Sequence, residues 1–226
     1  MNAAVKKIFD IPDWAGRKMV CFTAKYLEAR MFTSKDHSMS DEKNKFPSSF
    51  VSSQFVKYID SKEIKGIVEA LGNQLSQKYQ DQDLVLICVL KGSMVFTADL
   101  IRQIRGVKVY VDFVKLQAVG RGKENHGTIC ISKDYTTNLM DRNVVIVEEI
   151  VDTGRALSFL KKRILLSSPR SLEVVTLFDK PYKRTVNIQP DMTGKKIDDQ
   201  FIVGYGLDLE DYGRNFEQLY YLRYPN

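Results

Sequence analysis

The sequence predicts an α/β protein with a mainly parallel central sheet flanked by helices. Short, continuous apolar segments recur along the chain, and they are typical of strands that are buried on both faces. Between them lie segments with apolar residues at helical spacing, and strands that alternate with helices favour a parallel sheet. With 226 residues, of which 44% are hydrophobic, the chain can build one full core.

The first clear element is a helix after Asp60. Asp60 and Glu63 have the spacing of a capping box, and apolar residues then follow at helical spacing from Ile64 to Leu75. In chain order we then expect a buried strand at 84–90, a helix at 94–104, an alternating strand at 107–116, a buried strand at 143–147, an amphipathic helix at 156–166, and strands at 172–178 and 201–205. Residues 117–128 are rich in glycine and charge and predict a mobile loop.

Residues 1–48 differ from the rest, because their polar and apolar residues show no clear periodicity. No apolar segment follows the Lys6-Lys7 pair, as a secretory signal would require. We interpret the segment as a flexible or partly docked N-terminal extension; a functional arm, or a natural start at Met39, are the alternatives. Residues 49–226 form the predicted domain.

The composition excludes several classes. No apolar run approaches the roughly 20 residues of a membrane span, so a soluble protein is expected. Three cysteines (Cys21, Cys88 and Cys130) without C-x-x-C spacing do not suggest a disulfide framework or a zinc site, and they fit a cytoplasmic protein. The net charge of +6 suits nucleic acid or a small polyphosphate, but there is no Lys/Arg run that would favour nucleic acid.

Ligands of an open parallel sheet bind beyond the carboxyl ends of its strands. The loops expected there read Lys91-Gly92-Ser93, the Gly-rich segment 117–128, residues 148–154 and Asp179-Lys180-Pro181. In the third loop Glu148 and Glu149 follow a buried strand, and an Asp-Thr-Gly turn then opens a helix. The unpaired N–H groups of the helix start would hold a phosphate, with the carboxylates beside it to bind sugar hydroxyls. A structural role for the two glutamates alone, as partners of Lys or Arg, stays open.

Residues 148–154 resemble the phosphoribosyl pyrophosphate (PRPP) motif of the type I phosphoribosyltransferases. Together with Val89–Ser93, Val111-Asp112-Phe113, Asp179-Lys180-Pro181 and 201–208, they are similar to the hypoxanthine-guanine branch, in order and with ordinary spacing from about residue 50 onwards. The resemblance implies a Mg²⁺-dependent transfer of the phosphoribosyl group of PRPP to a 6-oxopurine. It also implies a small hood of N- and C-terminal segments, and a homodimer or homotetramer.

The resemblance implies a role for each matching residue. Lys91 and Gly92 would bind pyrophosphate beside a cis Leu90–Lys91 peptide, with Arg214 as a further contact. Glu148 and Glu149 would hold the ribose hydroxyls, and with Asp208 they would hold Mg²⁺. The 5′-phosphate would lie against a turn made of Asp152, Thr153, Gly154, Arg155, Ala156 and Leu157.

The base site implied by the resemblance contains the catalytic pair. Asp152 would be the general acid/base at purine N7, and Lys180 would donate to the 6-oxo group. Phe201 would stack on the base, Ile202 would contact its edge through the backbone, and Asp208 would lie beside it. Catalysis would come from stabilisation of the leaving pyrophosphate and from a lid, residues 117–128, that excludes water.

Four positions depart from the family pattern. Glu149 stands where Asp is typical, Ala156 where a Thr hydroxyl is usual, Lys115 where Arg is common, and Ala118-Val119 where the lid begins with Ser-Tyr. Ala156 and the altered start of the lid favour an alternative, a PRPP- or nucleotide-binding regulator with weakened catalysis, although Asp152, Lys180, Phe201 and Asp208 favour the enzyme. A nucleic-acid-binding module that uses the N-terminal segment ranks last.

Overall fold

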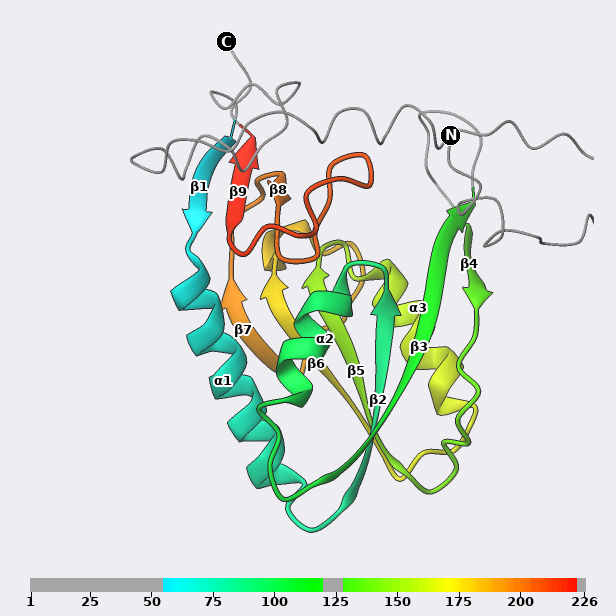
Figure 1. Ribbon diagram of the computed structural model, residues 1–226. Coiled ribbons are helices and arrows are strands. Elements are labelled where there is room, and N and C mark those ends of the chain that lie inside the picture. The colour runs from blue at the N-terminus through cyan, green and yellow to red at the C-terminus, as the bar shows by residue number, and fades with distance from the viewer. Residues whose placement is uncertain (1–54, 120–127, 223–226) are drawn as a thin grey trace, which may run out of the picture. The chain divides into compact units, whose positions relative to one another are not determined.

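The computed structural model describes residues 55–119 and 128–222, and it contains two sheets (Figure 1). The main sheet has six strands in the order β4-β3-β2-β5-β6-β7, and a smaller sheet has the order β1-β9-β8. Within the main sheet every neighbouring pair is parallel except β3 and β4. The predicted mainly parallel α/β fold is confirmed.

The bounds of the elements follow the chain. The main sheet consists of β2 (Asp83–Leu90), β3 (Lys108–Val119), β4 (Thr128–Lys133), β5 (Asn143–Val151), β6 (Ser171–Asp179) and β7 (Met192–Lys196). The helices are α1 (Ser61–Lys78), α2 (Ser93–Ile101), α3 (Arg155–Leu165) and the short 3₁₀ helix η2 (Pro181–Lys183). The small sheet joins β1 (Phe55–Ile59), β8 (Ile202–Val203) and β9 (Leu219–Leu222).

Helices cover both faces of the main sheet: α1 and α2 lie on one face and α3 on the other (Figure 1). The central strand β2 shows why, because its residues alternate between the two faces. Leu84, Leu86 and Cys88 belong to the core under α1 and α2, and Val85 and Ile87 belong to the core under α3. The strand is buried on both faces, as its unbroken apolar run predicts.

Helix α1 begins where the sequence predicts. The Asp60 carboxylate accepts a hydrogen bond from the backbone N–H of Glu63 at 2.8 Å, which satisfies one of the free donors of the first turn. The Glu63 side chain does not complete the capping box, since it pairs with Lys195 in β7. Glu63 therefore ties the start of α1 to the edge strand of the sheet.

Several sequence-based boundaries are corrected. The expected strand at 201–205 shrinks to β8 and lies in the small sheet, because Ile202 and Val203 pair with Tyr221 and Tyr220. The expected strand at 143–147 continues to Val151, so Glu148 and Glu149 lie within β5 and do not follow it. The helix expected at 94–104 is α2, which ends at Ile101. Four strands, β1, β4, β7 and β9, were not predicted.

The loop expected at 117–128 is shorter at both ends. Residues 117–119 belong to β3 and Thr128 to β4, which pair as an antiparallel hairpin. Residues 120–127 lie outside the described part of the chain, as does the expected N-terminal extension 1–48. In residues 55–119 and 128–222, no helix has the length and apolar character to cross a membrane.

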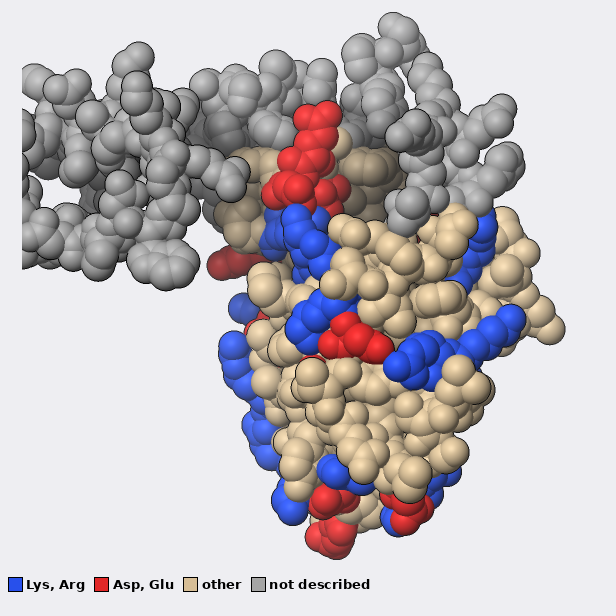
Figure 2. Space-filling model, turned by 90° about the vertical axis from the view of Figure 1, so that its right-hand side faces the viewer, with Lys and Arg blue, Asp and Glu red and all other residues tan. Residues whose placement is uncertain are grey.

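The face of the molecule on the side of α3 carries charges of both signs. Figure 2 shows groups of Lys and Arg side chains on this face, with groups of Asp and Glu between them. Two side chains of α3 form ion pairs, Arg163 with Asp134 and Lys161 with Asp191. Mixed charges of this kind do not create the single-sign field that attracts a nucleic acid backbone.

Candidate active site

Three of the four loops singled out by the sequence lie together at one edge of the main sheet. Because β2, β5 and β6 are parallel neighbours, their carboxyl ends share this edge, and the segment between β8 and β9 lies over it (Figure 1). The pyrophosphate loop, the phosphate turn and the base-side segment follow these three strands. These names, taken from the roles that the resemblance implies, denote residues 91–93, residues 152–154 and residues 180–188.

The pyrophosphate loop begins with a cis peptide between Leu90 and Lys91, as the resemblance implies. Two glycines allow close approaches to this loop: a Cβ on Gly92 would lie 1.7 Å from Oε1 of Glu149, and a Cβ on Gly206 would lie 2.1 Å from the Gly92 carbonyl oxygen. The Lys91 ammonium pairs with Asp211 at 2.7 Å. The loop is therefore held between the acidic pair of β5 and the segment between β8 and β9.

Glu148 and Glu149 form a pair of carboxyl groups at the end of β5. Burial raises the pKa of both groups, and the proximity of the two carboxyls raises that of Glu148 further. Oε2 of Glu149 is buried and has no hydrogen-bond partner among the described residues. No cationic side chain of residues 55–119 and 128–222 lies within hydrogen-bond reach of this oxygen.

Asp208 and Arg214 approach this acidic pair from the segment between β8 and β9. Their charges act on Glu149: burial raises its pKa most, the charge of Arg214 opposes this effect, and the charge of Asp208 adds to it. Arg214 binds Asp208 at 2.6 Å and donates to the Gly206 carbonyl at 2.8 Å. The structure thus brings Glu148, Glu149, Asp208 and Arg214 into one neighbourhood.

These carboxylates suit Mg²⁺, a hard cation that prefers oxygen ligands. The unpartnered Oε2 of Glu149 is an available ligand atom, and a cation would relieve the repulsion between the two glutamates. In the described part of the chain no three His, Cys, Asp or Glu side chains form a complete metal cluster. A Mg²⁺ ion here would need oxygens from a bound substrate, which is its usual mode beside phosphates.

The phosphate turn opens α3 without a side-chain cap. Gly154 is the N-cap and adopts φ +79°, a left-handed conformation that glycine adopts without a Cβ penalty. A cavity of about 120 Å³ lies beside the start of α3, where free N–H groups favour an anion. It is lined by Glu148, Ile150, Val151, Asp152, Thr153, Gly154, Ala156 and Leu157. Ala156 contributes no hydroxyl to it, whereas Arg155 is exposed at the first position of the helix.

On the base side, Lys180 is 6% exposed at the end of β6. Burial lowers the pKa of Lys180, although the charges of Asp152 and Asp199 oppose the effect. Its ammonium donates to the Gln200 carbonyl at 2.6 Å and lies 3.7 Å from the carboxylate of Asp199. Next along the chain, Phe201 is 47% exposed, and Ile202 is buried in β8.

Lys183 connects Lys180 to Asp152 through charges. Its ammonium lies 2.7 Å from Asp199 and 3.4 Å from Oδ2 of Asp152. Oδ1 of Asp152 is buried and lacks a hydrogen-bond partner within the described residues. The two residues predicted to be catalytic thus belong to one network, and one Asp152 oxygen is available to a ligand.

Sequence reasoning missed Lys183, Asp199 and Arg184. The only available signal was the adjacent Lys183-Arg184 pair just beyond Pro181, and a basic pair in a loop is more often solvated. Arg184 donates to the carbonyls of Val151, at 3.1 Å, and of Asp152, and it pairs with the Asp179 carboxylate. The two carbonyl contacts join residues that lie 33 and 32 positions apart in the chain, so they leave no local signature in the sequence.

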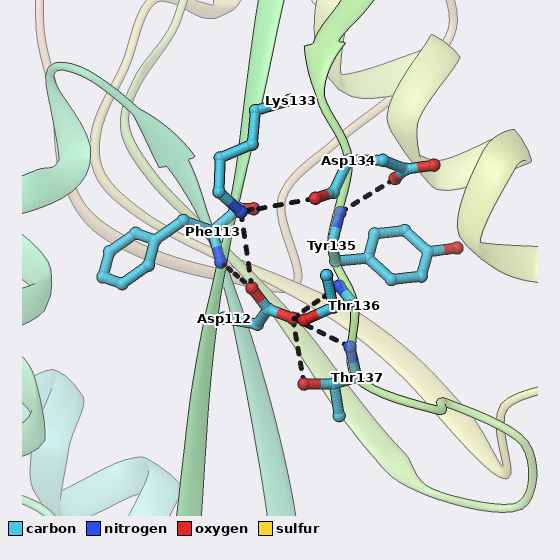
Figure 3. Close-up of polar contacts among 7 residues, drawn as sticks. All are labelled: Asp112, Phe113, Lys133, Asp134, Tyr135, Thr136 and Thr137. Carbon is cyan, nitrogen blue, oxygen red and sulfur yellow. Dashed lines mark hydrogen bonds and ion pairs between the residues drawn. The ribbon is translucent and has the colours of Figure 1, made fainter.

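Asp112 is a motif residue to which the sequence assigned no role. Figure 3 shows its carboxylate between β3 and the segment that follows β4. It accepts hydrogen bonds from the backbone N–H groups of Phe113 and Thr136 at 2.7 Å and of Thr137 at 2.9 Å. Lys133 lies 3.6 Å away. Asp112 therefore anchors the returning end of the β3–β4 hairpin.

Comparison with known proteins gives a consistent result. Residues 57–210 match the family model of the phosphoribosyl transferase domain. The chain is 39% identical over 166 residues to the hypoxanthine phosphoribosyltransferase of Buchnera aphidicola, which covers 73% of this chain and 92% of that protein. It is 38% identical over 157 residues to a hypoxanthine-guanine phosphoribosyltransferase of Staphylococcus aureus, and this match covers 70% of this chain and 87% of that protein.

A solved structure agrees with these relatives. The crystal structure of a hypoxanthine-guanine phosphoribosyltransferase from Bacillus anthracis superimposes with a TM-score of 0.71 at 35% sequence identity. The match covers 75% of this chain and 99% of that chain. The similarity therefore extends over almost the whole of the solved protein.

Proposed function

This chain belongs to the phosphoribosyltransferase family, and we propose that it is a hypoxanthine-guanine phosphoribosyltransferase of purine salvage. It would transfer the phosphoribosyl group of PRPP to hypoxanthine or guanine, with xanthine as a further substrate to be tested. The products would be IMP, GMP or XMP and pyrophosphate. We expect a cytoplasmic homodimer or homotetramer.

One observation carries the proposal. Lys183 joins Asp152, beside the phosphate turn, to Asp199, which lies 3.7 Å from Lys180. An oxopurine presents its N7 and its 6-oxo group on adjacent positions of one edge, so it needs a proton acceptor and a donor side by side. The Asp152 carboxylate and the Lys180 ammonium are such a pair, next to a turn built for a phosphate.

In the proposed reaction N9 of the base forms a bond to C1′ of the ribose, and the bond from C1′ to pyrophosphate breaks. The base loses its N7 proton to Asp152, whose Oδ1 is buried without a partner in the described part of the chain. Lys180 donates to the 6-oxo group, which favours oxopurines, because a 6-amino group would meet the ammonium with a donor. Phe201 covers the base face.

The pyrophosphate and ribose lie on the other side of the reacting carbon. Glu148, Glu149 and Asp208 would hold Mg²⁺ together with substrate oxygens, and the ion would neutralise charge on the pyrophosphate. Lys91 and Arg214, which now pair with Asp211 and Asp208, would turn to the leaving group. Thr153 and the first N–H groups of α3 would bind the 5′-phosphate.

The test is nucleotide formation from PRPP and Mg²⁺ with hypoxanthine, guanine, xanthine or adenine, followed by absorbance. Asp152→Asn removes the proton acceptor but keeps the shape, and we expect it to lower kcat by about 10²–10⁴-fold. Lys180→Met should relax the preference for oxopurines over adenine. Arg170→Ala, at the opposite end of the sheet, is the control and should leave turnover unchanged.

Two outcomes would change the conclusion. Calorimetric binding of PRPP without turnover of any base would replace the enzyme with a PRPP-binding regulator, the alternative that Ala156 and Ala118-Val119 favour. If neither PRPP binding nor turnover is found, both readings fail. Sedimentation of the same preparations measures the assembly.

A further inference from the structure

Arg184 follows η2 and directs its side chain back under the phosphate turn. The side chain is 13% exposed, and that of its partner Asp179 is 6% exposed. One guanidinium nitrogen donates to the carbonyls of Val151 and Asp152, and the other binds Asp179. The planar guanidinium group has five N–H donors, so it can bind a carboxylate and two carbonyls at once. A lysine ammonium cannot do this in the same geometry.

The surrounding base-side segment contacts the same turn. The backbone N–H of Lys180 donates to the Val151 carbonyl, and that of Thr185 donates to the Thr153 carbonyl, both at 3.0 Å. A Cβ on Gly154 would lie 2.5 Å from a methyl carbon of Ile188 and 2.8 Å from Cδ of Arg184. The phosphate turn thus rests directly on the base-side segment, without a gap.

The partner of Arg184 adds a connection to the base site. Asp179 is the last residue of β6 and directly precedes Lys180. Arg184 therefore joins the backbone at Asp152 to Asp179, the residue directly before Lys180. These two groups must contact N7 and the 6-oxo group at the same time, so their separation has to be fixed within a fraction of an ångström.

We propose that Arg184, which acts through the Val151 and Asp152 carbonyls and through Asp179, is a positioning residue that sets Asp152 and the phosphate turn relative to Lys180. The inference rests on the proposed function and deepens it. Arg184 touches neither substrate in this scheme; it fixes the distance between groups that do. Its loss should weaken both PRPP binding and the use of the base.

An open cavity makes the proposal testable by chemical rescue. It measures about 410 Å³ and is lined by Asp179, Pro181, Arg184, Val186, Asn187, Ile188, Gln189, Pro190, Thr193 and Lys196. Since Arg184 lines it, truncation of Arg184 to alanine leaves a space that solvent can reach. A guanidinium ion can enter this space and restore the missing donors, with Asp179 as its carboxylate partner.

The experiment compares wild type, Arg184→Ala, Arg184→Lys and Arg170→Ala, each with and without guanidinium at low millimolar concentration. The readouts are the Kd of PRPP in Mg²⁺ by calorimetry, kcat and KM for hypoxanthine, and the melting temperature. Arg170 forms a comparable pair with Asp141, but its side chain is 58% exposed and lies at the other end of the sheet. It controls for the loss of an arginine as such.

We expect Arg184→Ala to lose about 10–100-fold in kcat/KM, since small displacements of catalytic groups have such effects. PRPP affinity should also fall, and guanidinium should restore several-fold of both, in this variant alone. Arg184→Lys keeps a positive charge beside Asp179 but lacks the planar guanidinium. This variant should therefore fold, but its PRPP affinity and kcat/KM should stay reduced. Arg170→Ala should match wild type throughout.

The proposal is overturned if Arg184→Lys melts like wild type and has wild-type PRPP affinity and kcat/KM. It is also overturned if a folded Arg184→Ala loses activity that guanidinium does not restore, because that pattern indicates general damage. Should Arg184→Ala fail to fold, Arg184→Lys decides. A wild type that binds PRPP but turns over no base refutes the enzyme, and the PRPP affinities of the variants still test Arg184.

Discussion

Asp112 shows at the residue scale how a buried carboxylate is kept ionised. Burial alone would raise its pKa, but the N–H groups of Thr136, Thr137 and Phe113 lower it well below the usual range. The carboxylate connects β3 to the segment after β4 and so holds both ends of the hairpin around residues 120–127. Its contribution to stability is therefore tied to its charge.

Asp112→Asn should lower the free energy of unfolding at pH 7 by roughly 1.5–3 kcal/mol, because hydrogen bonds to a charged acceptor are lost. Because the pKa of Asp112 is lower in the folded than in the unfolded protein, its charge stabilises the fold when the pH is above the ordinary pKa of aspartate. This stabilisation is lost as the pH falls toward the pKa of the folded state. The difference between variant and wild type should thus shrink below about pH 4. Urea denaturation at several pH values measures it, and a difference independent of pH would contradict the assignment.

Ala156 offers a gain of function. Ala156→Thr would place a hydroxyl at the cavity beside the phosphate turn and should tighten PRPP binding by about tenfold, equivalent to one hydrogen bond to a charged group. Ala156→Val has the same shape without the donor and should bind no more tightly than wild type. Calorimetry with PRPP and Mg²⁺ distinguishes the two, and equal gains would show that packing alone is responsible.

At the scale of elements, the turn from β5 into α3 requires glycine. Gly154 has φ +79°, and a Cβ there would meet Ile188 and Arg184 within 3 Å. The matched position is Gly66 on the exposed side of α1, where a Cβ would meet nothing within 4 Å. The two glycines separate a requirement of the turn from the general effect of adding a methyl group.

Gly154→Ala should destabilise the protein by roughly 1–3 kcal/mol through backbone strain and also weaken PRPP binding. Gly66→Ala should stabilise it by about 0.5–1 kcal/mol, since alanine is the better helix former, and leave PRPP affinity unchanged. Thermal unfolding and calorimetry on both variants provide the comparison. If Gly154→Ala binds PRPP with wild-type affinity, the phosphate turn does not contribute to the binding site.

The elements also show what the sequence could predict. Strong periodicity identified α1, β2, β5, α3 and β6, and motif order placed their loops at one edge. The edge strand β7 was missed because Thr193, Gly194 and Lys195 have no strand-like alternation and pair through their backbone. Strand β4 was missed although Ile129 and Ile131 alternate with Thr128, Cys130 and Ser132. Contacts between segments distant in sequence, such as Arg184 with Asp179 and the Val151 carbonyl, have no local signature.

At the scale of the whole molecule, the small sheet β1-β9-β8 and the segment between β8 and β9 form the hood, which is joined to the main domain by a shared apolar core and by a few polar contacts. The Tyr205 hydroxyl donates to Asp99 of α2 at 2.7 Å, and burial together with Asp99 raises its pKa above the ordinary value. Lys91 reaches Asp211 from the pyrophosphate loop. The acidic pair of β5 and its partners Asp208 and Arg214 therefore depend on how these two parts are joined.

Tyr205→Phe keeps the ring but removes the hydroxyl, and it should lower the free energy of unfolding by about 0.5–1.5 kcal/mol. Amide hydrogen exchange should quicken around 202–208 but not in α1, because the lost hydrogen bond joins the hood to α2 and does not involve α1. Mass spectrometry of exchanged peptides locates the effect. If exchange is faster throughout the protein, or if its rate does not change anywhere, this hydrogen bond does not join the two parts.

The buried position of Cys88 in β2 has a practical consequence for spectroscopy. Burial raises the pKa of this thiol to about 12, so at neutral pH it stays protonated and unreactive toward maleimides. Cys130 is half-buried in β4, and Cys21 can be replaced by serine. A Cys21→Ser protein would then carry a fluorophore at Cys130 alone, on the strand that returns from residues 120–127, and its emission would follow PRPP binding in real time.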